Sequence, residues 1–249
     1  MALLPLQMAL GLNFFGPAPL FPLIIDDYGL TRGVVSLLVV SVAVPVTAFL
    51  IPGGILVTRL GPRKAIAISG FLMAAGMLAS VVPSFWALLP LRVAFGMGVA
   101  VLLPATTAVP AQWFGLQERP FIYGLNLGAQ STGVAAAMFL SGPIAEALGG
   151  WQAVLSLYGA FALLGATAWL LLGRSAPSGT GLKAAIPMRG VLGILKDKNT
   201  LLLSLACVGP FGVFVAFNSW LPTYYNEVFA MPLKKASYLV AIIPMMGML

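Results

Sequence analysis

Apolar runs follow one another along almost the whole of this chain. A membrane-spanning helix needs roughly 20 predominantly apolar residues. Such runs cover about residues 2–25, 34–57, 65–83, 85–110, 121–145, 151–172 and 200–222, and a last one, 236–249, ends with the chain. Strands of a β-barrel would alternate between apolar and polar residues, whereas residues 37–56 are apolar at odd and even positions alike. The sequence therefore predicts an all-α polytopic membrane protein.

Composition supports a lipid environment. Only 8% of the 249 residues are charged and 60% are hydrophobic, whereas a soluble domain carries about 25% charged residues. The first apolar run could be a signal peptide. However, no Lys or Arg precedes Arg32, and the run exceeds the usual apolar core of about 7–15 residues. We therefore interpret it as the first spanning helix.

Several function classes are excluded by the residues that are missing. The chain has no histidine and one cysteine, Cys207, so an internal disulfide, a cysteine-cluster metal site and the common histidine-based catalytic arrangements are not available. The net charge of +7 comes from basic residues in short gaps between apolar runs, which favours a topological role over nucleic-acid binding. We expect no enzymatic activity, no cofactor and no metal site.

The basic residues predict an orientation. Nine of them fall in gaps on one side, namely Arg59, Arg63, Lys64, Arg119, Arg174, Lys183, Arg189, Lys196 and Lys198, against three on the other, Arg32, Lys234 and Lys235. Loops rich in Lys and Arg stay in the cytoplasm. The sequence predicts a multi-pass protein of the plasma or inner membrane with its N-terminus in the cytoplasm.

The long polar stretch after the sixth run divides the chain. We predict an N-terminal six-helix bundle (1–172), a cytoplasmic linker (173–199) and the start of a C-terminal bundle (200–249). The linker begins with residues rich in Ser, Gly and Pro and includes a candidate interfacial basic helix near 183–196. Two sets of helices joined in this way are typical of many transporters.

The gap between the second and third runs reads Gly53-Gly54-Ile55-Leu56-Val57-Thr58-Arg59-Leu60-Gly61-Pro62-Arg63-Lys64. It resembles the major facilitator superfamily signature G-x-L-x-D-R-x-G-R-R/K, with matches at Gly54, Leu56, Arg59, Gly61, Arg63 and Lys64. We expect Gly54 to allow close helix packing and Gly61 with Pro62 to form a tight turn. The resemblance implies that this loop is a conformational gate. Thr58 stands where the family has Asp, so the gate would lack its carboxylate.

A second resemblance lies in the fourth run, where Leu91-Arg92-Val93-Ala94-Phe95-Gly96-Met97-Gly98-Val99-Ala100 is similar to the family's R-x-x-Q-G-x-G-x-A, except that Phe95 replaces the polar residue. A charge in mid-membrane costs about 2.5–3.5 kcal/mol on insertion scales. Arg92 is therefore expected to face a cavity or, alternatively, to snorkel to the outer surface. The family resemblance also implies about four more helices, so that the chain would be truncated in helix 8 and, at full length, a monomer.

The resemblance implies a midplane substrate site lined by helices 1, 4, 7 and 10. The intramembrane polar residues give the candidate substrate-binding set: Arg92, Asn13, Gln130, Asn126 and Asn218. Asn126 and Gln130 could instead bond between helices, Trp220 and Tyr224 could be interfacial aromatics, and Gly124, Gly128 and Thr132 form a small-residue stripe that predicts helix packing.

Function is predicted from the lone arginine. None of helices 1–7 contains an intramembrane Asp or Glu, so Arg92 favours an anionic solute that would neutralise it. We predict a secondary transporter of a small organic or inorganic anion working by alternating access, with solute and membrane lipid as its partners. The alternatives are a multidrug efflux antiporter of the same superfamily and a non-transporting membrane scaffold or fragment. Residues 1–249 by themselves are expected not to transport.

Overall fold

The computed structural model describes residues 2–174, 193 and 196–246. All regular elements in these ranges are helices. In chain order they are α1 (Leu4–Phe15), η1 (Ala18–Leu20), α2 (Phe21–Tyr28), α3 (Arg32–Val35), α4 (Leu37–Leu60), α5 (Pro62–Met73), η2 (Ala74–Val81), α6 (Phe85–Trp113), α7 (Arg119–Leu148), α8 (Trp151–Leu172), α10 (Lys198–Val228), α11 (Leu233–Val240) and α12 (Ile242–Met246). Nearly all of the interfacial helix predicted near 183–196 lies outside the described residues.

Seven helices in this part of the chain are long and apolar enough to cross a membrane. They match the seven complete runs of the sequence, and the predicted all-α polytopic fold is confirmed. The partial eighth helix begins at Leu233, earlier than its apolar run. Lys234 and Lys235 therefore lie in the first turn of α11 rather than in the gap before it.

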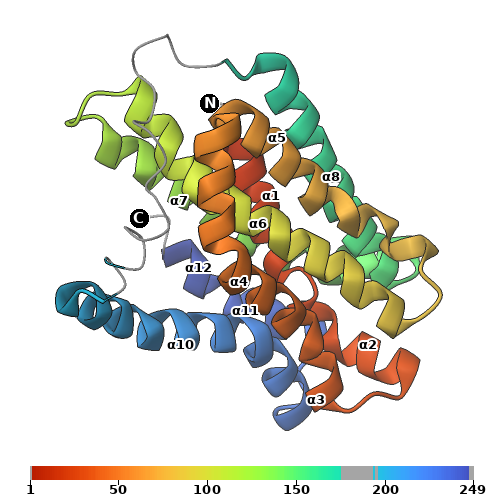
Figure 1. The fold of residues 1–249 in the computed structure, drawn as a ribbon. Coiled ribbons are helices and arrows are strands. Elements are labelled where there is room, and N and C mark those ends of the chain that lie inside the picture. The colour runs from red at the N-terminus through yellow and green to blue at the C-terminus, as the bar shows by residue number, and fades with distance from the viewer. Residues whose placement is uncertain (1, 175–192, 194–195, 247–249) are drawn as a thin grey trace.

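The first six spans pack into one bundle (Figure 1). Helix α4 packs along α6, α1 along α7, and α5 between α6 and α8. We call the end that holds the N-terminus and the α4–α5 turn the proximal end, and the end that holds α2 and α3 the distal end (Figure 1).

Close helix crossings in the bundle depend on glycines other than the predicted ones. A Cβ on Gly53 would collide with the Ala100 carbonyl oxygen of α6, whereas a Cβ on Gly54 would only touch Pro104 at 3.8 Å. In the predicted stripe of Gly124, Gly128 and Thr132, neither glycine is at a close crossing: an added Cβ on either one meets nothing within 4 Å in the described structure.

One close crossing joins α1 and α7 through Gly11 and Gly133. A Cβ on Gly133 would collide with the Met8 carbonyl oxygen, and a Cβ on Gly11 would collide with the Gln130 carbonyl oxygen. Small residues at such a crossing let two backbones touch. This contact holds the first span at a fixed distance from α7.

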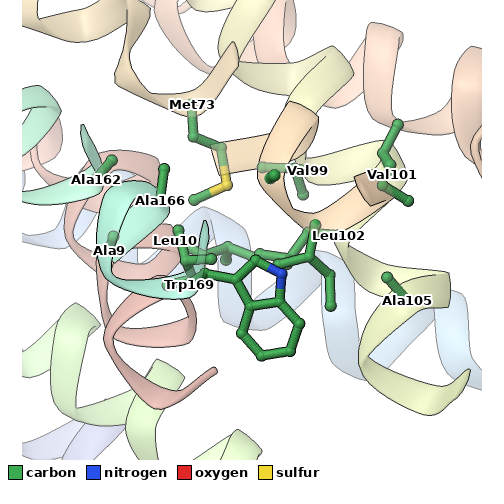
Figure 2. Packing of buried hydrophobic residues seen from close by; sticks show 14 of the residues in the cluster. Ala9, Leu10, Met73, Val99, Val101, Leu102, Ala105, Ala162, Ala166 and Trp169 are labelled. Atoms are coloured by element: carbon green, nitrogen blue, oxygen red, sulfur yellow. The ribbon is translucent and has the colours of Figure 1, made fainter. Parts of the chain in front are cut away.

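A hydrophobic cluster fills the proximal half of the bundle, with side chains from α1, α5, α6 and α8 (Figure 2). Trp169 of α8 packs in this cluster among residues that include Leu10 and Leu102. Its indole Nε1 donates a hydrogen bond of 2.9 Å to the backbone oxygen of Arg63. The cluster therefore fixes the α4–α5 turn to the end of α8.

The first span is broken in its distal half. Pro17 and Pro19 lack the amide proton that a continuous helix requires, and the span divides there into α1, η1 and α2. The kink that these two prolines predict is thus present, and it leaves backbone carbonyls in the bundle interior that need other donors.

The seventh span, α10, contacts the bundle mainly through its distal half. Its buried residues are Asn218, Ser219, Pro222 and Thr223, whereas side chains nearer its start, such as Leu203 and Phe211, are more than 60% exposed. Figure 1 shows the start of α10 diverging from the bundle and its end approaching α3. Helices α11 and α12 pack against α7.

Candidate functional site

The buried polar residues of the bundle gather at the break in the first span. In a continuous helix the amide of residue 17 would donate to the carbonyl of Asn13, four positions earlier. Pro17 cannot, and the guanidinium Nη1 of Arg92 donates to that oxygen instead, at 2.7 Å. The Nη2 of Arg92 donates to the Phe14 oxygen at 3.3 Å, and its Nε donates to the Leu38 oxygen of α4 at 3.2 Å.

Arg92 lies inside the protein rather than at its surface, so the snorkelling alternative is wrong. The residue is 5% exposed, and its Cζ lies 5.2 Å from the centroid of the Phe95 ring. No carboxylate among the described residues forms an ion pair with it. The positive charge is met by carbonyl dipoles and one aromatic face.

Asn13 joins the same network through its side chain. Its Nδ2 donates to the Ala9 oxygen at 3.0 Å and to the Tyr158 oxygen of α8 at 2.8 Å. On the other side of the break, the hydroxyl of Ser141 donates to the Gly16 oxygen at 3.3 Å and lies 3.0 Å from the Tyr158 hydroxyl. Two of the five predicted residues, Arg92 and Asn13, thus meet at the break.

Sequence reasoning missed Ser141 and Tyr158 as members of this network. The two prolines predict unpaired carbonyls at positions 13 and 15, but Ser141 bonds the oxygen of Gly16 and Tyr158 meets the Asn13 side chain through its backbone oxygen. No sequence signal pointed to these two residues, because their contacts depend on the packing of α7 and α8 against α1.

A cavity of about 360 Å³ lies between the first, second and seventh spans. Its lining residues are Phe14, Val39, Ala43, Val46, Thr47, Phe211, Gly212, Val215, Ala216, Ser219 and Trp220. None of the five predicted substrate-binding residues lines it. Arg92 stands directly behind the wall, since it holds the backbone oxygen of Phe14.

Asn218 is next to the cavity wall on α10 and is completely buried. Its Nδ2 donates to the Phe214 oxygen at 2.9 Å. Its Oδ1 has no partner among the described residues, and neither does the hydroxyl of Ser219 or of Thr223. This stretch of α10 therefore holds polar atoms that a solute or water could engage.

Asn126 and Gln130 lie away from this cavity. Asn126 lines a separate pocket of about 200 Å³ near the start of α1, with Leu3 and Trp169 among its neighbours, and its Nδ2 has no partner in the described structure. Gln130 is partly buried on α7, and its backbone oxygen faces Gly11 at the helix crossing. The structure does not bring these two residues together with Arg92.

The predicted gate loop is a tight turn at the proximal end. Gly61 has φ +79° and ψ 153°, a region essentially restricted to glycine. The Thr58 hydroxyl donates to the Ile55 oxygen of its own helix at 2.8 Å, and Arg63 donates to the Leu170 oxygen of α8 at 3.1 Å. Arg59 and Lys64 are exposed and form no ion pair with a described residue.

The two aromatic residues of α10 differ in their surroundings. The Trp220 ring lies 5.2 Å from that of Phe21 and lines the cavity, so Trp220 is not simply an interfacial residue. Tyr224 is 49% exposed and stacks near Tyr225 and Phe229 at the distal end, as an interfacial aromatic would.

Seven apolar spans, a broken first helix and a buried arginine held by backbone oxygens define an integral multi-pass membrane protein. The family model of the Major Facilitator Superfamily matches residues 3–249. The chain belongs to this superfamily.

Individual relatives agree with the family. The chain is 28% identical over 226 residues to the "Probable anion transporter 4, chloroplastic" of Arabidopsis thaliana, covering 77% of this chain and 40% of that protein. It is 32% identical over 146 residues to the "Probable nitrate/nitrite antiporter NarK1" of Thermus thermophilus, covering 52% of this chain and 31% of that protein.

A solved structure shares the fold. The bacterial homolog of the human lysosomal transporter Spinster superposes with a TM-score of 0.79 at 19% identity, over 98% of this chain and 59% of that one. The chain thus spans less than two thirds of the length of each of these three proteins.

Proposed function

We propose that this chain supplies the N-terminal bundle and the start of the C-terminal bundle of a secondary transporter that moves a small anion by alternating access. The division follows the sequence: 1–172 is the first bundle, 173–199 the cytoplasmic linker and 200–249 the start of the second. In support, the first six spans form one packed unit and α10 contacts it only in part. The N-terminus and the gate loop are assigned to the cytoplasm from the distribution of Lys and Arg.

One observation supports the proposal that the substrate is an anion: Arg92 is a buried charge with no carboxylate partner among the described residues. A buried charge without a counter-ion is costly, and an anion in the cavity would offset that cost. The guanidinium bonds the backbone oxygen of Phe14, and Phe14 is one of the residues that line the cavity. A small change at the break would expose Arg92 to a solute there. The relatives described as anion and nitrate/nitrite carriers support the same class.

The test is uptake by liposomes that contain the protein as its gene encodes it. Nitrate, phosphate and a short alkyl sulfonate would be compared, because they differ in size and charge. Arg92→Gln should reduce anion uptake at least tenfold, and Arg92→Lys should retain part of it because the positive charge remains. Arg119→Gln is the control, since Arg119, like Arg92, donates to backbone oxygens, in its case those of Ala111 and Phe114 at the α6–α7 turn. Equal anion uptake by the Arg92 and Arg119 variants would contradict the proposal.

A second candidate, efflux of apolar compounds, is favoured by the cavity lining. Most of its lining residues are apolar, with Phe14, Phe211 and Trp220 among them, and Thr47 and Ser219 contribute the hydroxyls. Apolar walls suit hydrophobic solutes. Cells that produce the protein would then tolerate higher concentrations of lipophilic compounds, and Arg92→Gln would leave that tolerance intact. Resistance profiles of producing and non-producing cells separate the two candidates.

A further inference from the structure

An ion pair joins the first bundle to α10 at the distal end. The Nη2 of Arg32 lies 2.5 Å from Oε2 of Glu227, and the Nε of Arg32 lies 3.3 Å from Oε1. Both carboxylate oxygens are engaged, which is the two-point geometry that makes an arginine–carboxylate contact directional. It is the one ion pair found among the described residues, and the two residues are 195 positions apart in the chain.

Local structure positions both partners. Arg32 is the first residue of α3, and the Thr31 hydroxyl caps that helix by accepting from the Val34 amide at 3.4 Å. Glu227 lies in the last turn of α10. Just before it, the Asn226 side chain donates to the Met231 oxygen at 2.8 Å and fixes the turn that follows. The two charges are therefore presented by held helix ends and not by free loops.

The pair lies beyond the distal limit of the cavity. Trp220 is the lining residue of α10 nearest that end, and its ring packs against Phe21 of α2 at 5.2 Å. Glu227 lies two turns further along the same helix. From the cavity outward, the order is thus an aromatic contact and then an ion pair, each linking the first bundle to α10.

Contact between the bundle and α10 is concentrated at this end. The buried residues of α10 start at Asn218, and its earlier residues are mostly exposed. Separating the two parts at the distal end would break the ion pair and the aromatic contact together. We propose that Arg32 and Glu227 form a latch that favours the state in which the cavity is closed at the distal end. This inference rests on the proposed alternating-access function.

The strength of the latch fits a reversible step. The side chains of Arg32 and Glu227 are 68% and 32% exposed, and ion pairs with such exposure are weak and screened by salt. Losing the pair is therefore expected to shift the balance of states by about two- to fivefold. A latch of this size biases the carrier toward one state without trapping it.

Thiol labelling without any solute tests the proposal in membranes that contain the protein as its gene encodes it. Cys207→Ser removes the native thiol, and Thr47→Cys places a reporter in the cavity lining. A membrane-impermeant thiol reagent is applied from the distal face. Glu227→Gln should raise the labelling rate of the reporter about two- to fivefold, and Arg32→Glu should do the same. The charge swap Arg32→Glu with Glu227→Arg should return the rate toward that of the parent.

Glu146→Gln is the matched control. It makes the same chemical change at an exposed distal carboxylate that forms no ion pair with a described residue, and it should label at the parent rate. Labelling of Glu227→Gln at the parent rate, or of the charge swap as fast as the single variants, would overturn the latch. Reagent applied to the opposite face should label Glu227→Gln more slowly than the parent. If Glu227→Gln instead labels more slowly than the parent from the face taken as distal and faster from the opposite face, the latch is supported and the assigned membrane orientation is wrong.

A disulfide gives an independent measurement. With Cys207→Ser, the double variant Arg32→Cys with Glu227→Cys should cross-link under mild oxidation and block distal labelling of the reporter until it is reduced. Failure to cross-link would overturn the inferred contact. Labelling that follows these expectations in a protein that takes up no anion would support the latch and contradict the proposed substrate class.

Discussion

The guanidinium Nη1 of Arg92 lies 2.7 Å from the backbone oxygen of Asn13, the acceptor that Pro17 deprives of its helical donor. An arginine on α6 thus completes the hydrogen bonding of a helix that is far away in sequence. The same side chain also donates to the backbone oxygen of Phe14, a residue that lines the cavity. The geometry of the cavity and the charge behind it are therefore coupled.

The first prediction separates this structural role from solute binding. Arg92→Met should leave the Asn13 oxygen without a donor, a loss of about 1–3 kcal/mol for a buried group. Pro17→Ala restores an amide proton at position 17, so Arg92→Met should cost about 1 kcal/mol less in that background. Unfolding free energies of the four proteins in detergent give this coupling. Strictly additive effects would mean that Arg92 does not replace the missing amide.

The second prediction concerns the crossing of α1 and α7. Gly133→Ala should destabilise the protein by about 1–3 kcal/mol, because the new methyl group would collide with the Met8 backbone oxygen. Gly128→Ala on the same helix meets nothing within 4 Å in the described structure and should be neutral or stabilising by up to about 1 kcal/mol. Thermal unfolding in detergent distinguishes them, and similar melting temperatures for the two variants would show that the crossing is looser.

The third prediction concerns two glycines with different backbone angles. Gly61 has φ +79° and ψ 153°, which other residues adopt only at a cost of about 1–3 kcal/mol. Gly149 has φ 74° and ψ 24°, a left-handed conformation that Asn tolerates. Gly61→Asn should therefore lower the stability of the protein and Gly149→Asn should change it little. Their unfolding midpoints test this, and the reverse order would contradict the backbone argument.

The fourth prediction concerns orientation. In a Cys207→Ser background, Leu60→Cys at the proximal end should react with an impermeant thiol reagent only after cells are opened. Leu148→Cys at the exposed distal end of α7 should react in intact cells. This follows from the nine basic residues assigned to the cytoplasmic side. Labelling of Leu60→Cys in intact cells would reverse the assignment.

The spans were predictable from sequence because lipid imposes one simple requirement, a long apolar helix. The break at Pro17 and Pro19 was predictable for a similarly local reason, since proline lacks an amide proton. The contacts between neighbouring helices could not be predicted in this way. Gly54 and the Gly124–Gly128 stripe have the right composition for close packing, but rotation of each helix about its axis decides which glycine meets a neighbour, and Gly53 and Gly133 do so.

The candidate site was predictable only in part. An arginine in an apolar helix is expected to face the protein interior and to bond groups there, and Arg92 does so. Its partners could not be predicted, because they are backbone oxygens, which every residue carries. The apolar cavity lining was missed for a related reason: polarity was the criterion for candidate residues, whereas Phe14 and Phe211 line the cavity through their position.

The hydrogen bond that Arg92 donates to the Asn13 oxygen has a consequence for how the sequence can change during evolution. If position 17 in a descendant reverts to an ordinary residue, the helix regains its own donor and selection on Arg92 for that duty ends. If the arginine were lost first, the Asn13 backbone oxygen would be left without a donor in the apolar interior of the bundle. Lineages are therefore expected to give up the proline before the arginine, so the order of two substitutions would record which hydrogen bond came to depend on the other.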